Sequence, residues 1–505
     1  MLVEDGLRLA KCWDIAAVQR LLVGGWRADP ARVWADLNDV GGDLPVVAPV
    51  DLFSEPDDDR DADEPVRADG FLKPEWLAPD FVWTPARLAR WARLAAEAAS
   101  LQQARLANLG DRPKALATAR SESAAELLCS ELSADGLPMD RFVAESIIES
   151  FVGPRPRTET EAEEQRRARD GEVLRHSSNA NCDLRNPAQV KSLLRGIGVE
   201  LPDTRAWRLE AIRGSHPLVD ALLEWRKAER IATTFGYGWL DEHLGADGRL
   251  RGEWSASDGA AGRMTATAGL HNMPAHLRSA VIAASDHVFV RADLGQIEPR
   301  ILAVVSGDGA LAQAAMQDDM YLPVADQLGV DRATAKVAVL GAMYGQTTGH
   351  GATALRALEQ AYPVAMRYLS DADVAGQVGR DIRTYGGRLV RMGSTRAGGL
   401  SDRDDRSRAA AQGRYGRNAM VQGAAAEFFK VWAVMVRARA AELDAQIVLC
   451  LHDELLVHAP AGKGSALAQL VVDCLADAAR HWAQDNAVRF VADVSVISRW
   501  SDSKN

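Results

Sequence analysis

Residues 287–308 read HVFVRADLGQIEPRILAVVSGD, and this stretch decides the fold class. Its first half combines β-branched and aromatic side chains and ends in an acid, a pattern typical of a short strand. From Gln296 onward the apolar spacing is that of a helix. Asp293, at the end of the strand, can be held rigidly at a sheet edge, which suits a hard divalent cation. Taken alone, an aspartate there is more often a turn or helix-cap residue.

A second acid lies near the C-terminus. The apolar runs AQIVLCL (445–451) and LLVHAP (455–460) flank His452, Asp453 and Glu454, which predicts a hairpin. The simpler interpretation of these three residues is a tight polar turn. A fold that places Asp453 beside Asp293 would let the two carboxylates clamp two Mg²⁺ ions, one at an attacking hydroxyl and one at a triphosphate.

The segment DRATAKVAVLGAMYG (331–345) predicts a helix that ends at Gly345. Arg332, Lys336, Leu340 and Tyr344 are four residues apart, so they share one face on which a triphosphate and a base could lie. An amphipathic surface helix with a buried tyrosine explains this segment equally well. The chain has nine Lys against 50 Arg. Lys336 is therefore a candidate general acid for a departing pyrophosphate, because its compact ammonium can donate a proton.

Composition gives the general class of the protein. The 505 residues are 47% hydrophobic and 26% charged, as in soluble globular proteins, and the length indicates about three domains. Five widely spaced cysteines without a C-x-x-C pair argue against zinc or a disulfide framework and favour a reducing compartment. With no leader pattern and no long apolar window, we expect a cytoplasmic protein that does not enter a membrane.

The net charge of −11 argues against an acidic partner, although binding follows the local field rather than the total charge. Residues 376–418 contain ten Arg against four Asp, a stripe that could hold phosphates or be a solvated face. Residues 52–70 concentrate Asp, Glu and Pro and predict a linker. From about residue 76 to 240 the apolar spacing is mostly helical.

Three segments together indicate a family. DLGQIEPRILAVVSGD, RATAKVAVLGAMYG and LHDELLVHAP resemble, in the expected order, the three polymerase motifs of family A DNA polymerases, the bacterial DNA polymerase I family. GRMTATAGLHNMP (262–274) resembles the segment before the first motif, and GRYGRNAMVQGAAAEFFK (413–430) the helix before the third. The similarity extends over residues 180–505. It is greatest to the short actinobacterial members described as bifunctional exonuclease/polymerase.

The resemblance implies an α+β, right-hand polymerase fold with thumb, palm and fingers, and a degenerate, truncated exonuclease-like N-terminal domain. The expected domains are an exonuclease-like remnant with the acidic linker (1–75), a connecting helical segment (76–122), a thumb-like helical region (123–245), a palm segment with the first metal acid (246–310), the fingers (311–400) and a palm segment with the second metal acid (401–505).

The resemblance also implies residue roles. Asp293 and Asp453 would bind two Mg²⁺ ions, assisted by the Leu294 carbonyl, with Glu454 as an auxiliary acid. The dNTP-binding residues would be Arg332 and Lys336 at the triphosphate, Tyr344 at the nascent base pair, Glu298 as a steric gate supported by Gln296, and Leu340 and Tyr321 beside them. Primer and template contacts would come from Arg263, Arg414, Asn418, Gln422 and His452.

Several positions differ from the usual family pattern. Leu340 stands where the family has Phe or Tyr, and Tyr321 where it has His. Pro299 is expected to interrupt the helix after Glu298, and Leu294-Gly295 replaces a common Tyr-Ser. None of these changes removes a metal ligand or a phosphate-binding cation.

The N-terminal segment CWDIAAVQRLLVGG (12–25) resembles the second acidic segment of a proofreading exonuclease, with Asp14 as the matching acid. An exonuclease needs several carboxylates for its own metal pair, and the other acidic motifs are missing, which predicts no proofreading. The sequence thus predicts a monomeric, template-directed DNA polymerase that uses dNTPs and primer-template DNA at the nucleoid, in replication or repair. The alternatives are a single-subunit RNA polymerase and a non-catalytic DNA-binding relative.

Overall fold

The structure is a computed structural model that describes residues 3, 5–46, 63–177, 181–345, 351–393, 402–483 and 488–503. The chain divides into two compact units. The first comprises Met1–Ala134, Trp254–Thr265 and Val290–Val496, and the second Asp135–Glu253, Ala266–Phe289 and Ile497–Asn505. Most of the expected acidic linker, residues 52–62, and Arg396 of the arginine stripe lie outside the described residues.

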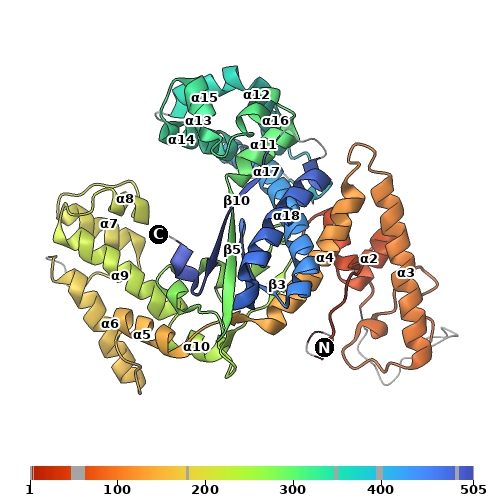
Figure 1. The fold of residues 1–505 in the computed structure, drawn as a ribbon, viewed down its shortest axis with the longest axis horizontal. Helices are drawn as coiled ribbons and strands as arrows, with labels where there is room; N and C mark the ends of the chain where they lie inside the picture. Colours follow the sequence, from red (N-terminus) through yellow and green to blue (C-terminus); the bar gives the residue numbers. More distant parts are fainter. Residues whose placement is uncertain are drawn as a thin grey trace. The chain divides into compact units, whose positions relative to one another are not determined.

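A four-stranded sheet, in the order β10-β5-β9-β8, carries the quoted strand and hairpin. Its strands are β5 (His287–Gly295), β8 (Gln446–Cys450), β9 (Glu454–Pro460) and β10 (Val491–Ile497). β8 and β9 pair antiparallel, with Cys450 opposite Leu455, so the predicted hairpin is confirmed. Residues 454–459 of β9 are all buried, which explains why the apolar residues 455–457 follow one another without alternating with polar ones. Figure 1 shows β5 beside β10.

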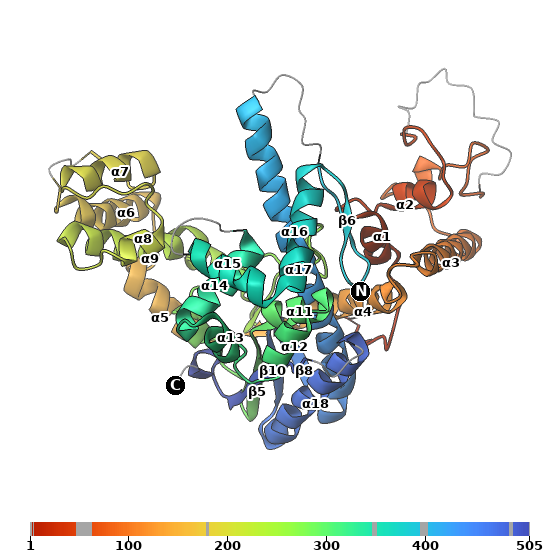
Figure 2. The same ribbon diagram turned by 90° about the horizontal axis from the view of Figure 1, so that it is seen from above.

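Helices α11 to α18 of the first unit follow β5 along the chain. Figure 2 shows the long α17 running beside α16. Phe428 and Trp432 of α17 are fully buried and form the middle of the main apolar core. The helices are α11 (Ile297–Ser306), α12 (Gly309–Ala314), α13 (Tyr321–Leu328), α14 (Arg332–Tyr344), α15 (Gly351–Ala361), α16 (Pro363–Gln377), α17 (Asp402–Ala440), η4 (Ala441–Leu443), η5 (Ala461–Lys463) and α18 (Gly464–Ala483).

Helix α11 corrects one expectation. It runs without a break through Pro299, so the prediction that this proline interrupts the helix is wrong. Pro299 lies in the first helical turn, where the backbone N–H groups have no partner within the helix in any case. Its fixed φ angle is therefore compatible with the start of the helix that carries Glu298.

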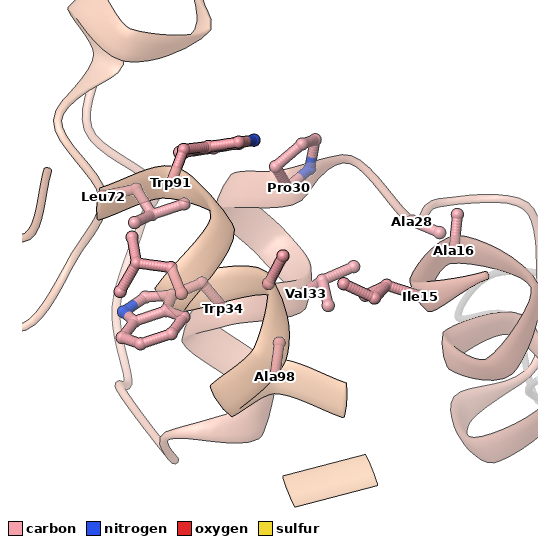
Figure 3. Close-up of a pocket in the computed structure, with 11 residues that line it drawn as sticks. Ile15, Ala16, Ala28, Pro30, Val33, Trp34, Leu72, Trp91 and Ala98 are labelled. Carbon is pink, nitrogen blue, oxygen red and sulfur yellow. The ribbon is translucent and has the colours of Figure 1, made fainter. Parts of the chain in front are cut away.

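The N-terminal part of the first unit is helical. It contains α1 (Ile15–Val23), α2 (Pro30–Leu37), η1 (Pro74–Leu77), α3 (Pro85–Ala107) and α4 (Ala115–Asp135). The expected domain boundary at residue 123 falls inside α4, and that division stays a prediction. Asp14 accepts a hydrogen bond from the Ala17 N–H (2.7 Å) and so caps α1. An apolar cavity of about 190 Å³ lies between these helices, with Val33 and Trp34 among its lining residues (Figure 3).

The second unit is mainly helical and has its own apolar core, which includes Val173, Leu193 and Leu222. Its elements are β1 (Leu137–Pro138), α5 (Arg141–Val152), α6 (Glu159–Leu174), α7 (Pro187–Gly196), α8 (Ala206–Glu210), α9 (Pro217–Thr234), α10 (Tyr237–His243), β2 (Arg249–Leu250), η2 (Leu270–Asn272), η3 (Leu277–Ala280) and η6 (Trp500–Ser503). Residues 136–140 separate α4 from α5, and the Asn186 side chain caps α7.

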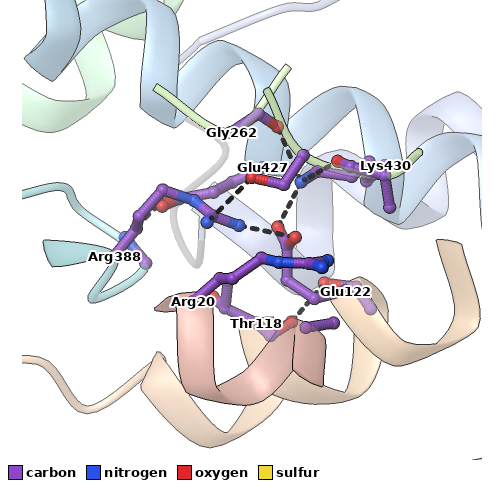
Figure 4. Close-up of polar contacts among 12 residues, drawn as sticks. Arg20, Thr118, Glu122, Gly262, Arg388, Glu427 and Lys430 are labelled. Atoms are coloured by element: carbon purple, nitrogen blue, oxygen red, sulfur yellow. Dashed lines mark hydrogen bonds and ion pairs between the residues drawn. The ribbon is translucent and has the colours of Figure 1, made fainter. Parts of the chain in front are cut away.

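A buried ion cluster joins α4, α17 and the small β6–β7 hairpin (Ile382–Arg383 and Leu389–Val390) of the first unit (Figure 4). Glu122 pairs with Arg388 (2.5 Å) and with Lys430, and all three side chains are fully buried. Burial alone would raise the pKa of Glu122, but the two cations outweigh it and hold that pKa below its ordinary value. Such a cluster is costly to break, since removing one partner typically costs about 3–5 kcal/mol.

This cluster also changes the interpretation of the arginine stripe. Arg388 is internal, Arg391 pairs with Asp381 (3.1 Å), and Arg417 donates to the Ala342 carbonyl (3.0 Å). Arg388 and Arg417 therefore act within the fold, whereas the side chain of Arg391 is 59% exposed.

Helix α17 is long and apolar enough to pass a length-and-hydropathy test for a membrane span, over Asp404–Leu443. Within the protein, 83% of the tested window is buried. That burial is typical of a central core helix, because a helix that is apolar all round can be covered by its own protein.

Candidate active site

One backbone hydrogen bond brings the two predicted metal acids together. The Leu294 N–H donates to the Asp453 carbonyl (2.7 Å), so the end of β5 lies against the β8–β9 turn. Burial, and then the negative charge of Asp453, raises the pKa of Asp293 to about 6. The pKa of Asp453 is also raised, by burial and then by Glu454. The two carboxylates are therefore neighbours that repel each other.

Beside these acids the first unit contains a cleft of about 390 Å³. Twelve of the residues predicted from the sequence line it: Arg263, Leu294, Gln296, Glu298, Tyr321, Arg332, Lys336, Leu340, Tyr344, Gln422, His452 and Asp453. Residues from β5, α11, α14, α17 and the hairpin turn thus meet at one place, although they are far apart in the sequence.

The lining does not include Asp293, Arg414, Asn418 or Glu454. The Arg414 side chain lies against Gly345, which ends α14 with a φ of +69°; a Cβ there would come within 2.9 Å of Arg414 Cγ. Asn418 is one turn further along α17, half-buried. The Glu454 side chain is only 6% exposed and contacts Arg291.

Helix α14 presents its cations as the spacing predicted. Arg332 and Lys336 are exposed and line the cleft one turn apart. Arg332 pairs with Asp319, which also accepts a hydrogen bond from Gln296 Nε2 (2.7 Å). The side chain of Gln296 forms hydrogen bonds with Asp319, Met320 and Arg300, and none with Glu298 in the described part of the chain.

Glu298 is held by two other cleft residues. Arg263 lies 3.2 Å from Glu298 Oε1, and the Tyr344 hydroxyl donates to Oε2 (2.6 Å). Burial, and then this hydrogen bond, raises the pKa of Tyr344, while burial and Arg263 lower the pKa of His452. Burial also raises the pKa of Tyr321 to about 12. The tyrosines and His452 are therefore neutral near pH 7.

The sequence analysis missed Arg291, Asp319 and Arg300. Arg300 is fully buried and donates to the carbonyls of Gly295, Ala315 and Gln317, among others, and so fixes the turn after β5. Arg291 bonds Asp293 (2.6 Å). The period of two along a strand could have revealed Arg291, because residues 291 and 293 share one face of β5.

The donor set fits a hard divalent cation. Two aspartate carboxylates and a backbone carbonyl from Leu294 are oxygen ligands of the kind that Mg²⁺ prefers. Burial, and then the charge of Asp453, raises the pKa of Asp293, and a divalent cation would relieve the part that comes from Asp453. Among the described residues no three His, Cys, Asp or Glu side chains gather as a metal site.

Comparison with known proteins identifies the family. The model of DNA polymerase family A matches residues 159–502, about two thirds of the chain. The chain belongs to this family. DNA polymerase I of Deinococcus radiodurans is 26% identical over 363 residues, which cover 64% of this chain and 36% of that protein. DNA polymerase I of Chloroflexus aurantiacus is 28% identical over 324 residues, 58% of this chain and 33% of that protein. The chain thus spans about a third of the length of these relatives.

A solved structure shows the same fold. The POL domain of Pol1 from M. smegmatis, in complex with DNA primer-template and dNTP, superposes with a TM-score of 0.69 at 22% identity. The match covers 97% of this chain and 82% of that one. The expected α+β fold of the right-hand polymerase type is confirmed by this likeness.

Replacing Asp293 by Asn should stabilise the metal-free protein at pH 7–8, by about 1 kcal/mol after allowance for solvent screening of this partly exposed group. The sign follows from the raised pKa of about 6: ionised Asp293 is unfavourable in the folded state. The gain in the free energy of unfolding should be complete above about pH 6 and vanish as the pH falls toward 4. Thermal denaturation in EDTA, compared across this pH range, measures it; a lower melting temperature for the variant at pH 7.5 contradicts the prediction.

Proposed function

We propose that this protein is a DNA-directed DNA polymerase that adds deoxynucleotides from dNTPs to a primer 3′-OH, using two Mg²⁺ ions. The observation that carries the proposal is the hydrogen bond from Leu294 to Asp453, because it puts two acids beside a cleft lined by Arg332 and Lys336. Membership of family A supports the same activity. We further propose that it acts as a monomer on DNA in the cytoplasm, in replication or repair.

The acids have one proposed task. Asp293 and Asp453, with the Leu294 carbonyl, would hold the metal ions, which when bound supply charge stabilisation to the reacting phosphate and lower the pKa of the attacking hydroxyl. The two acids come from the end of β5 and the β8–β9 turn, both anchored in the sheet. Such anchoring keeps the ligands in a fixed geometry, which metal-assisted phosphoryl transfer requires.

The cations of α14 would bind the triphosphate. Arg332 can offer a planar fork of donors to phosphate oxygens, and Lys336 a compact ammonium one turn closer to Leu340. To bind phosphate, Arg332 would exchange its partner Asp319 for the substrate, so Asp319 holds the guanidinium near the cleft until then. Lys336 would donate the proton to the departing pyrophosphate.

Discrimination between deoxyribose and ribose would come from Arg263, Glu298 and Tyr344. Arg263 and Tyr344 both hold the Glu298 carboxylate in place, so it would exclude a 2′-hydroxyl sterically. Tyr344 would then abut the nascent base pair with its ring. Gln422 and His452 would contact the minor groove of the primer-template duplex, where shared acceptors allow geometry checking without sequence preference. Arg414 and Asn418, on the same helix as Gln422, would contact the template further along the duplex.

Replacing Asp453 by Asn should lower the rate of primer extension by at least about a thousandfold, because metal catalysis contributes several kcal/mol. DNA binding, measured by gel shift, should change less than about threefold. The matched control is Asp444→Asn, an exposed acid outside the cleft, which should extend primers at the wild-type rate. Equal extension by both variants would end the two-metal assignment.

A single-subunit RNA polymerase is the nearest alternative, and Glu298 speaks against it. Extension reactions run side by side should consume dNTPs and not rNTPs. Glu298→Ala should reduce the preference for dNTPs by about tenfold or more, equivalent to about 1.4 kcal/mol. A wild-type protein that prefers rNTPs would favour the alternative. A gel shift without any extension would instead favour the non-catalytic DNA-binding relative.

We also propose that the protein lacks proofreading, because a 3′-to-5′ exonuclease needs several carboxylates for its own metal pair and only Asp14 matches that pattern. A 3′-labelled single strand incubated with the protein and Mg²⁺ should stay intact. The same assay with the Asp293→Asn variant shows whether any loss of label depends on the polymerase site. Degradation that is independent of Asp293 would contradict the prediction.

A further inference from the structure

Arg291 is a buried cation in contact with one of the proposed metal acids. It lies on β5, two residues before Asp293 and on the same face of the strand, and its side chain is 8% exposed. Its Nη2 donates to Asp293 Oδ2 (2.6 Å), and its Nε to Glu454 Oε1 (2.7 Å). Asp493, on the neighbouring strand β10, lies 3.9 Å from its third nitrogen. One guanidinium thus connects acids on three adjacent strands.

These contacts use the particular shape of arginine. A guanidinium is flat and carries donors in a fixed fork, so two of its nitrogens can orient two separate carboxylates at once. Glu454 is also buried, which leaves this pair little freedom to rotate. Asp293 is consequently held through one oxygen, and its other oxygen remains for a metal ion.

We propose that Arg291, itself held by Glu454, is a positioning residue that orients Asp293, and that it also acts as a built-in counter-cation, weakening divalent metal binding in the DNA-free protein. This inference rests on the proposed polymerase function. The positive charge of Arg291 already relieves part of the repulsion between Asp293 and Asp453, so a bound metal ion would have less repulsion to relieve. Metal ions would therefore bind tightly only in the complex with DNA and dNTP, where the substrate phosphates add their own negative oxygens.

Removing Arg291 should strengthen metal binding but slow catalysis. A unit charge a few ångströms from a metal ion changes its affinity strongly, so removing the guanidinium should strengthen metal binding. Freeing one short carboxylate side chain changes affinity only a few-fold, since its lost order is small. Catalysis, in contrast, depends on the exact placement of Asp293 and should suffer whenever the fork is lost.

The test is Mn²⁺ binding to the DNA-free protein at pH 7.5, measured by electron paramagnetic resonance, together with primer-extension kinetics. Arg291→Met should bind Mn²⁺ at least about tenfold more tightly than the wild type, and Arg291→Lys, which keeps the charge, within about threefold of it. Both variants should lose about tenfold or more in kcat with little change in KM for dNTP, because neither can hold two carboxylates at once.

A double variant guards against failure to fold. If Arg291→Met does not fold by circular dichroism, Arg291→Met/Glu454→Gln is compared with Glu454→Gln alone, since the double variant removes a buried charge together with its countercharge. The double variant should again bind Mn²⁺ at least about tenfold more tightly than its reference.

The outcomes separate this inference from the proposed function. Wild-type Mn²⁺ binding that is unchanged by Asp453→Asn would overturn the metal site itself. Wild-type binding that is lost in Asp453→Asn, combined with equal or weaker binding in Arg291→Met, would overturn the counter-cation role alone. An Arg291→Lys variant with wild-type kcat would overturn the positioning role.

Discussion

The hydrogen bond from the Leu294 N–H to the Asp453 carbonyl is the contact on which the site depends. It connects the end of a central strand to a hairpin turn that follows much later in the chain, and so puts two carboxylates side by side. A backbone bond serves this purpose well because it sets the register of the strands independently of the side chains. Asp453 can then line the cleft, and neither acid side chain is needed to hold the strands together.

Bringing two acids together has an electrostatic cost, and the surrounding structure offsets it. The pKa of Asp293 is raised by burial first and by the charge of Asp453 second. Arg291 partly compensates from within the sheet, and the fully buried Glu122 cluster stabilises the frame behind it. Active sites commonly concentrate such unfavourable charge where chemistry needs it, while the rest of the fold supplies the stability.

The Glu122 cluster is also connected, through Gly262, to Arg263 and Glu298 in the cleft. Lys430 donates to the Gly262 carbonyl (2.8 Å), and Gly262 has a φ of +87° with the Arg388 side chain against its Cα. Only glycine fits there, because a Cβ would come within 2.3 Å of Arg388 Nε. The next residue is Arg263, which holds Glu298, so a buried ion pair fixes the start of the segment that reaches into the cleft.

The sequence by itself determined the local elements and the family. The spacing of apolar residues and the positions of glycines predict the strand at 287–295, the hairpin around Asp453 and the helix that ends at Gly345. Twelve of the predicted site residues line one cleft. Only the tertiary structure decided which charges meet. The sequence could not show that Arg291 pairs with Glu454 on the next strand, that Asp319 pairs with Arg332, or that Arg388 lies inside the protein rather than on a phosphate-binding stripe. Local pattern fixes which face a side chain occupies, whereas its partner across the core depends on how distant segments pack.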